Sequence, residues 1–103
     1  MFKLQPNPTF KSKVGISIAG ALRPADIEVE FKYLSKEKVR EYFDRLQGKT
    51  DAEALAEIIV GWSGVDEAYS DVALEMLVDN YPAAAADLFE TFRKELLEAK
   101  RKN

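Results

Sequence analysis

Residues 58–70 read Ile58-Ile59-Val60-Gly61-Trp62-Ser63-Gly64-Val65-Asp66-Glu67-Ala68-Tyr69-Ser70, and the rest of the chain is arranged around this stretch. It holds the only tryptophan in 103 residues and two of the five glycines within four positions. Glycine favours tight turns because it adopts backbone conformations that other residues avoid. Serine favours the start of a helix because its hydroxyl accepts a hydrogen bond from a free backbone amide. We therefore expect one helix to end between Gly61 and Gly64 and another to begin at Ser70.

Apolar spacing predicts a helix on each side of this turn. The earlier helix begins at Thr50, because Thr50-Asp51-Ala52-Glu53 has the sequence of a capping box. Its apolar residues recur at i, i+3, i+4 and i+7, on one helical face: Leu55, Ile58, Ile59 and Trp62. This phase favours a core position for Trp62 over a role as a binding anchor. The later helix has the predicted inner stripe Val72, Ala73, Met76 and Leu77.

Two further helices flank this pair. The first follows a serine cap at Ser35, stops at Gly48 and has the stripe Val39, Tyr42, Phe43 and Leu46. The last begins at Pro82, whose missing amide costs nothing in a first turn. Its stripe is Ala85, Leu88, Phe89, Phe92 and Leu96. After it, the basic tail Lys100-Arg101-Lys102 places positive charge at the negative end of the helix dipole.

The N-terminal part alternates with a period of two, which is typical of strands. Two runs show it: Phe10, Val14, Ile16 and Ile18, with Ser12 on the same side, and Ile27, Val29, Phe31 and Tyr33. The polar face is basic in the first run and mainly acidic in the second, so antiparallel pairing brings opposite charges together. Gly15 marks either a bulge or a close backbone contact. The predicted fold class is α+β: an N-terminal antiparallel β-hairpin (8–34) followed by four α-helices in a compact bundle (35–103), forming a single domain (1–103).

Composition argues against several classes of function. The chain has no cysteine and no histidine, so the usual ligands of zinc and the commonest general base are missing. We therefore expect no metal site, no cofactor and no enzymatic activity. With 18 acidic and 15 basic residues the net charge is -3, which disfavours a nucleic-acid-binding surface. No apolar run approaches the roughly 20 residues that span a bilayer, so we expect a cytoplasmic protein that is not in a membrane.

A small DNA-binding regulator or antitoxin is the alternative of a different class. Helices two and three would then form a helix-turn-helix, but residues 70–81 contain no lysine or arginine for phosphate contacts. The basic segment from Lys94 to Lys102 is interrupted by Glu95 and Glu98, which indicates a solvated helix end. Asp66 and Glu67 do not follow the spacing of a calcium loop, so we assign them to turn chemistry.

Two sets of residues are candidates for binding a protein partner. Val65, Asp66 and Tyr69 form the exposed lip of the turn. Phe92, Leu96 and Leu97 belong to a broad apolar face on the last helix. That face either covers the hairpin or docks on a partner, and the sequence leaves both interpretations open.

The chain resembles the tail assembly chaperones of long-tailed bacteriophages and prophages. The resemblance rests mainly on a tryptophan-centred turn and a later helix start, in this string: Gly61-Trp62-Ser63-Gly64-Val65-Asp66, Tyr69-Ser70, Leu74, Leu77 and Asn80-Tyr81-Pro82-Ala83-Ala84. It extends to Phe2-Lys3-Leu4, Asn7-Pro8-Thr9-Phe10 and Ile27-Glu28-Val29-Glu30-Phe31 near the start of the chain.

This resemblance implies a non-enzymatic chaperone made in the cytoplasm of the bacterial host. Such a protein binds the long helical tape measure protein, keeps it soluble and helps to recruit tail tube subunits. It implies that the chaperone is absent from the mature virion. Another phage structural or interaction protein is a further alternative, and homo-oligomerisation stays open.

Overall fold

A computed structural model describes residues 1–98 and confirms the α+β fold class. Within these residues it has one three-stranded sheet, in the order β1-β2-β3, and four helices. Residues 99–103 are not described, so the predicted interaction of Lys100, Arg101 and Lys102 with the last helix lies outside the described residues. That the whole chain forms a single domain stays a prediction.

Strands β1 (Thr9–Ile16) and β2 (Ala25–Lys32) form the predicted antiparallel hairpin. Lys11 lies opposite Glu30 and Lys13 opposite Glu28, which confirms that the basic and acidic faces pair. The register runs through Gly15 without a shift. A Cβ atom at Gly15 would lie 3.1 Å from Cγ of Pro24, so this glycine marks a close contact rather than a bulge.

The predicted second helix is wrong in its second half. Helix α2 covers only Asp51–Ala56, and Ile59–Ser63 forms a third strand, β3, antiparallel to β2. β-Branched residues such as those at 58–60 favour strands because their side chains pack well on a pleated surface. The helix therefore ends before Trp62, which belongs to the sheet.

A β-bulge explains why the strand imitates helical spacing. Ile59 lies opposite Phe31 and Trp62 lies opposite Val29, with the register shifting between them. Phe31 and Val29 are two residues apart and share the core-facing side of β2. The extra residue, Val60, is exposed, so residues three apart in β3 reach the same face. The bulge thus accounts for the spacing of Ile59 and Trp62, whereas Leu55 belongs to α2.

The helix starts follow the sequence closely. Ser35 caps α1 (Lys36–Asp44), the Thr50 capping box opens α2, and Ser70 caps α3 (Asp71–Asn80), all as predicted. Helix α4 spans Ala84–Leu97 and begins two residues after Pro82, with Ala83 as an N-cap that makes no side-chain hydrogen bond. Helix α1 ends before Gly48, which has a positive φ of 86° in the following turn.

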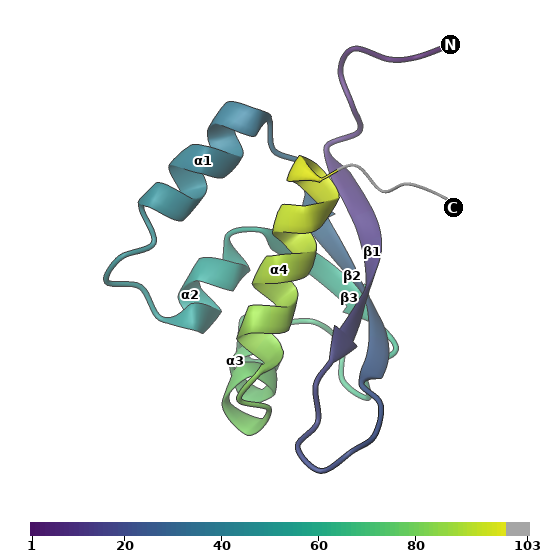
Figure 1. The fold of residues 1–103 in the computed structure, drawn as a ribbon, viewed down its shortest axis with the longest axis vertical. Helices are drawn as coiled ribbons and strands as arrows, with labels where there is room; N and C mark the ends of the chain where they lie inside the picture. Colours follow the sequence, from purple (N-terminus) through teal and green to yellow (C-terminus); the bar gives the residue numbers. More distant parts are fainter. Residues whose placement is uncertain (99–103) are drawn as a thin grey trace.

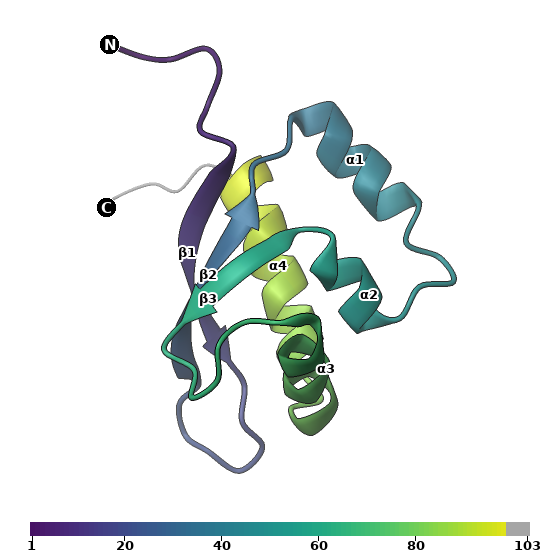
Figure 2. The ribbon, with the colours of Figure 1, turned by 180° about the vertical axis from the view of Figure 1, so that it is seen from behind.

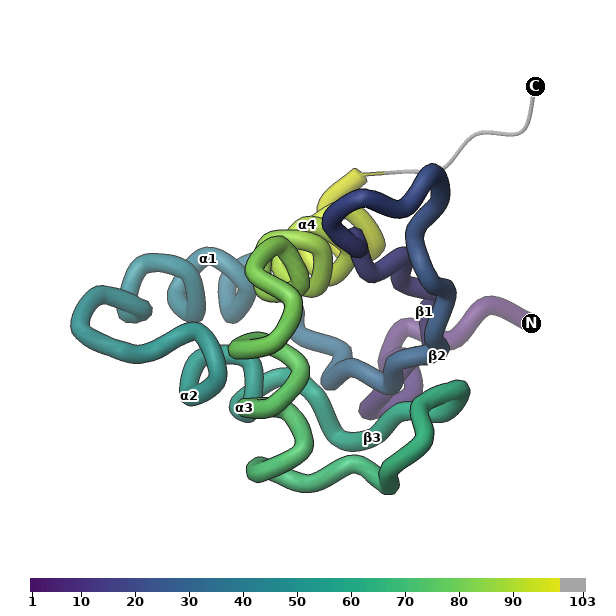
Figure 3. The backbone as a smooth tube through the Cα atoms, turned by 90° about the horizontal axis from the view of Figure 1, so that it is seen from below, coloured from purple at the N-terminus to yellow at the C-terminus, as the bar shows by residue number. Residues whose placement is uncertain are grey.

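The helices cover one face of the sheet, as Figures 1 and 2 show from opposite sides. Viewed from below in Figure 3, the strands lie to one side and the helices to the other, with α4 next to the hairpin. Phe92 of α4 has no exposed surface, and its ring lies 5.5 Å from that of Phe31 and 5.9 Å from that of Tyr42. The core is therefore built mainly between α4 and the apolar side of the hairpin.

Helix α3 is rotated relative to its predicted phase. Its buried residues are Ala73 and Leu74, whereas Val72 is 66% exposed and Met76 is 45% exposed. The predicted inner stripe is therefore wrong for Val72 and Met76. Because α3 has apolar residues around most of its circumference, the sequence does not settle which of them face the sheet.

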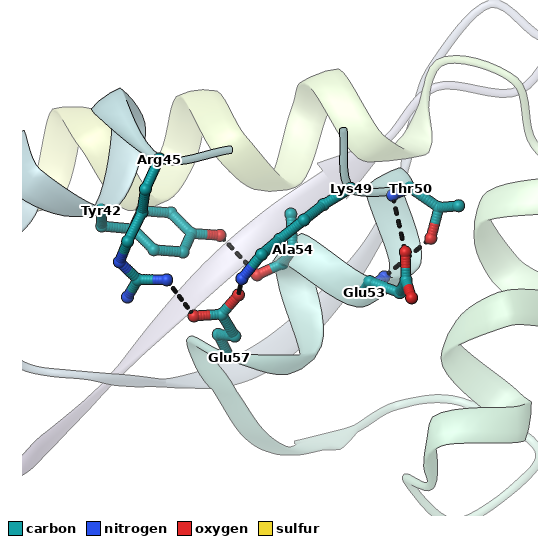
Figure 4. A network of polar contacts seen from close by, with 7 residues as sticks. All are labelled: Tyr42, Arg45, Lys49, Thr50, Glu53, Ala54 and Glu57. Carbon is teal, nitrogen blue, oxygen red and sulfur yellow. Dashed lines mark hydrogen bonds and ion pairs between the residues drawn. The ribbon is translucent and has the colours of Figure 1, made fainter. Parts of the chain in front are cut away.

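A polar network ties α1 to α2 (Figure 4). The buried Tyr42 hydroxyl donates to the backbone carbonyl of Ala54, and burial raises the pKa of Tyr42 well above its ordinary value. Lys49 and Arg45 both bind the Glu57 carboxylate, with the arginine nitrogen 2.6 Å from it. These hydrogen bonds, that from Lys49 first, lower the pKa of Glu57. Each polar group in the network has a partner, which indicates a structural role.

Candidate functional site

A groove lies between the turn after β3 and helix α3, and we call it the corner groove. Its volume is about 240 Å³. The lining residues are Trp62, Val65, Asp66, Glu67, Ala73, Met76, Leu77, Asn80 and Tyr81. Figure 2 shows how the segment after β3 leaves the sheet and reaches α3, which brings the two walls together. The walls are mainly apolar, with carboxylates on the side of the turn.

Trp62 holds the turn in place. Its ring nitrogen donates a hydrogen bond to the backbone carbonyl of Glu67 at 2.9 Å. The ring of Tyr69 meets the indole edge-to-face, with centroids 5.1 Å apart and planes at 83°. The Tyr69 hydroxyl donates to the backbone carbonyl of Ile59 at 3.3 Å, and burial raises its pKa. These contacts link the later part of the turn, at Glu67 and Tyr69, back to β3.

The predicted lip residues lie around this groove. Val65 is half-buried and Asp66 is exposed, and both line the groove. Tyr69 is half-buried behind Trp62 and supports the groove without lining it. Trp62 is half-buried and packs against the edge of the core, so its predicted core position is confirmed in part. A role of Val65, Asp66 and Tyr69 in binding stays a prediction.

The candidates on α4 lie apart from this groove. Phe92 is buried, Leu96 is half-buried against the core, and Leu97 is 44% exposed. Figure 1 shows that the end of α4 with these residues lies next to the start of β1, whereas α3 lies near the other end of α4. For Phe92 the structure therefore supports the core interpretation and leaves no exposed surface for a partner. Of these three residues, Leu97 is the most accessible.

Sequence reasoning missed the exposed apolar residues of α3 and its C-terminal end. Val72, Met76 and Tyr81 are all exposed, and Met76 and Tyr81 line the corner groove. The charge distribution contained a signal for this region. Ten of the 18 acidic residues and none of the 15 basic residues lie between Lys49 and Arg93. A segment with apolar residues and only one sign of charge differs from an ordinary mixed surface.

Within residues 1–98, no group of three or more carboxylates is placed to hold a metal ion. In the same part of the chain, no helix is long and apolar enough to cross a membrane. What the corner groove can do is accept an apolar side chain beside a positively charged one, because its walls combine Met76 and Trp62 with two carboxylates.

Comparison with known proteins gives one finding. A family model described as phage tail assembly chaperone matches residues 1–103, which is the whole chain. Searches of curated proteins and of solved structures gave no significant match.

Proposed function

The chain belongs to the phage tail assembly chaperone family, and from this premise we propose that it binds the tape measure protein and keeps it soluble until the tail tube forms. The resemblance noted in the sequence is thus confirmed at the level of the family. A chaperone family fits a protein that acts by binding partners in tail assembly. The tape measure protein as the partner, and help in recruiting tail tube subunits, belong to the proposal.

The observation that carries the proposal is the exposed apolar surface on α3. Val72 and Met76 face solvent although the helix already buries Ala73 and Leu74 against the core. Exposed apolar side chains that lie together, rather than scattered singly, are typical of surfaces that meet other proteins. A long helical protein exposes apolar stripes before it is enclosed, and such stripes dock in grooves of this kind.

The proposal includes a place and a time of action. The chaperone works in the cytoplasm of the bacterial host and is absent from the mature virion, because it is needed only until the tube encloses its client. Homo-oligomerisation is compatible with this role and is not required by it.

The alternative of a DNA-binding regulator receives no support from the fold. Helices α2 and α3 are separated by β3, so they do not form the compact helix-turn-helix unit. Helix α3 carries the carboxylates Asp71, Glu75 and Asp79 and no basic residue, which would repel the phosphate backbone. A flat titration with duplex DNA at low salt is the expected result.

Co-expression tests the proposed function. The chain is produced together with the tape measure protein of the same phage, and the soluble fraction of that protein is measured with and without the chain. We expect the soluble fraction to rise and the two proteins to co-elute in size-exclusion chromatography.

A matched pair of variants links the effect to α3. Met76→Gln removes the exposed apolar side chain beside the corner groove, whereas Leu22→Ser changes a fully exposed leucine in the hairpin loop. Rescue should fall with Met76→Gln and persist with Leu22→Ser. Absence of both rescue and co-elution for the unmodified chain would refute the proposed function.

A further inference from the structure

The exposed apolar stripe of α3 lies beside a stripe of carboxylates. Asp71, Glu75 and Asp79 are spaced by four residues, so they share one face of the helix. Val72 and Met76 have the same spacing and form the neighbouring row. The outer side of α3 therefore has one apolar row and one acidic row running along the same helix.

A second groove extends this surface towards α2, and we call it the α2–α3 groove. Its volume is about 510 Å³. The residues that line it are Thr50, Asp51, Ala52, Val72, Glu75, Met76, Val78 and Asp79. Met76 lines both this groove and the corner groove, so the two hollows meet at one flexible apolar side chain. Methionine adapts its shape to different partners.

Within the described residues, no ion pair neutralises the carboxylates around the two grooves. Within residues 1–98, none of the ion pairs joins a cation to these residues: Asp51, Asp66, Glu67, Asp71, Glu75 and Asp79. The nearest basic residues in sequence are Lys49, which binds Glu57, and Arg93, which binds Glu98. In the part of the chain that the structure describes, this surface thus presents apolar side chains among carboxylates that have no ion-pair partner.

We propose that the α2–α3 groove and the corner groove together bind a cationic amphipathic helix, which lays its apolar stripe over Met76 and Val72 and its lysines or arginines against the carboxylates. The inference rests on the proposed function in taking this helix to be a segment of the chaperone's client. Charge complementarity selects the occupant, because a neutral or acidic helix would leave the carboxylates unpaired or repelled. The apolar row selects an amphipathic helix over a merely basic chain.

A peptide titration tests the chemistry of this surface. The probe is a fluorescein-labelled peptide of leucine and lysine, about 18 residues or roughly five helical turns long, with leucines at i, i+3, i+4 and i+7. Two comparison peptides have the same composition in scrambled order, or glutamate in place of lysine. Fluorescence anisotropy with the full chain in about 50 mM NaCl should show binding at least about tenfold tighter for the amphipathic lysine peptide than for either comparison. Equal binding of the scrambled or the glutamate peptide overturns the proposal.

Matched charge reversals locate the binding. The double variant Glu75→Lys and Asp79→Lys changes two carboxylates four residues apart on α3. The control, Glu37→Lys and Glu41→Lys, makes the same change at the same spacing on exposed positions of α1. Binding should weaken about tenfold or more in the α3 variant only, and the difference should shrink in about 500 mM NaCl, where charges are screened beyond about 4 Å. Equal weakening in both variants refutes the location.

Two further measurements keep the test decisive if a reversal disturbs folding. Met76→Gln retains the charge and should weaken binding of the amphipathic peptide while leaving the scrambled peptide unaffected. Amide chemical shifts of the unmodified chain should change within residues 50–53, 62–67 and 71–81 when the peptide is added. Shift changes confined to β1 or α4 would overturn the proposal, as would a salt-sensitive dimer of the chain that uses this surface in place of the peptide.

The outcome separates this inference from the proposed function. Co-elution with the tape measure protein without peptide binding at α3 would reject the surface and leave the function standing. Peptide binding at α3 without rescue or co-elution would reject the function and leave the surface standing.

Discussion

Replacement of Phe92 by alanine is the sharpest test of the core. Phe92 has no exposed surface, and four other aromatic rings have their centroids within 6.4 Å of its own. Truncation of a buried phenylalanine to alanine removes the transfer energy of the ring and leaves a cavity, at a total of about 3–5 kcal/mol. A domain of this size has a total stability of about 5–15 kcal/mol, so the variant should fold but be marginal.

Urea denaturation measures this loss. With a denaturant slope of about 1.5 kcal/mol/M, a loss of about 4 kcal/mol lowers the urea midpoint by about 2–3 M. Circular dichroism and the fluorescence of Trp62 should report the same transition if unfolding is two-state. Leu97→Ala, at a partly exposed position on the same helix, should cost less than about 1 kcal/mol and serves as the control. A loss below about 1 kcal/mol in Phe92→Ala would contradict the packing described above and return Phe92 to the candidates for partner binding.

Three further predictions test the turn, a cap and the polar network. Trp62→Phe removes the hydrogen bond to the Glu67 carbonyl and part of the ring contact, and should destabilise the chain by about 1–2 kcal/mol in thermal melts followed by circular dichroism. Ser70→Ala removes the N-cap of α3 and should cost about 1 kcal/mol, which Ser70→Asn should largely avoid. The pKa of Glu57 is lowered in the folded state, first by the hydrogen bond from Lys49, so its stabilisation is present above the pKa of the unfolded chain and is lost as the pH falls through the folded pKa. Glu57→Gln should therefore lose stability at neutral pH but little in acid, so a gap to the unmodified chain that persists at low pH would contradict this account.

The orientation of α3, which differs from the predicted one, matters for the proposed function. A helix with Val72 and Met76 turned inward would have left an ordinary acidic surface. With those side chains in solvent, the same helix presents apolar area beside Asp71, Glu75 and Asp79. The proposed binding surface thus depends on the observed orientation of α3, in which Val72 and Met76 lie in solvent and not in the core as the sequence predicted.

Local features of the fold were predictable from the sequence alone. The caps at Ser35, Thr50 and Ser70 depend on hydrogen bonds to residues three positions later, so the sequence around each one contains all the necessary information. The hairpin was also accessible, because alternation with a period of two is a local pattern and the two strands follow each other in the chain with opposite charges on their polar faces. The tryptophan-centred turn also identified the family, although it was expected at the end of a helix.

The tertiary structure decided the features that depend on contacts between residues far apart in the sequence. Strand β3 exists because β2 offers it backbone hydrogen bonds, and the bulge at Val60 places Ile59 and Trp62 on one face with the same spacing that a helix would give. The burial of Phe92 depends on rings from β1, β2 and α1, which only folding brings together. The candidate site depends on the same step, because carboxylates from three separate segments form one surface once α3 packs beside α2 and the turn. Hydrogen bonds between near neighbours are encoded locally, whereas the choice of which apolar face to bury is settled by the competition of all elements for a single core.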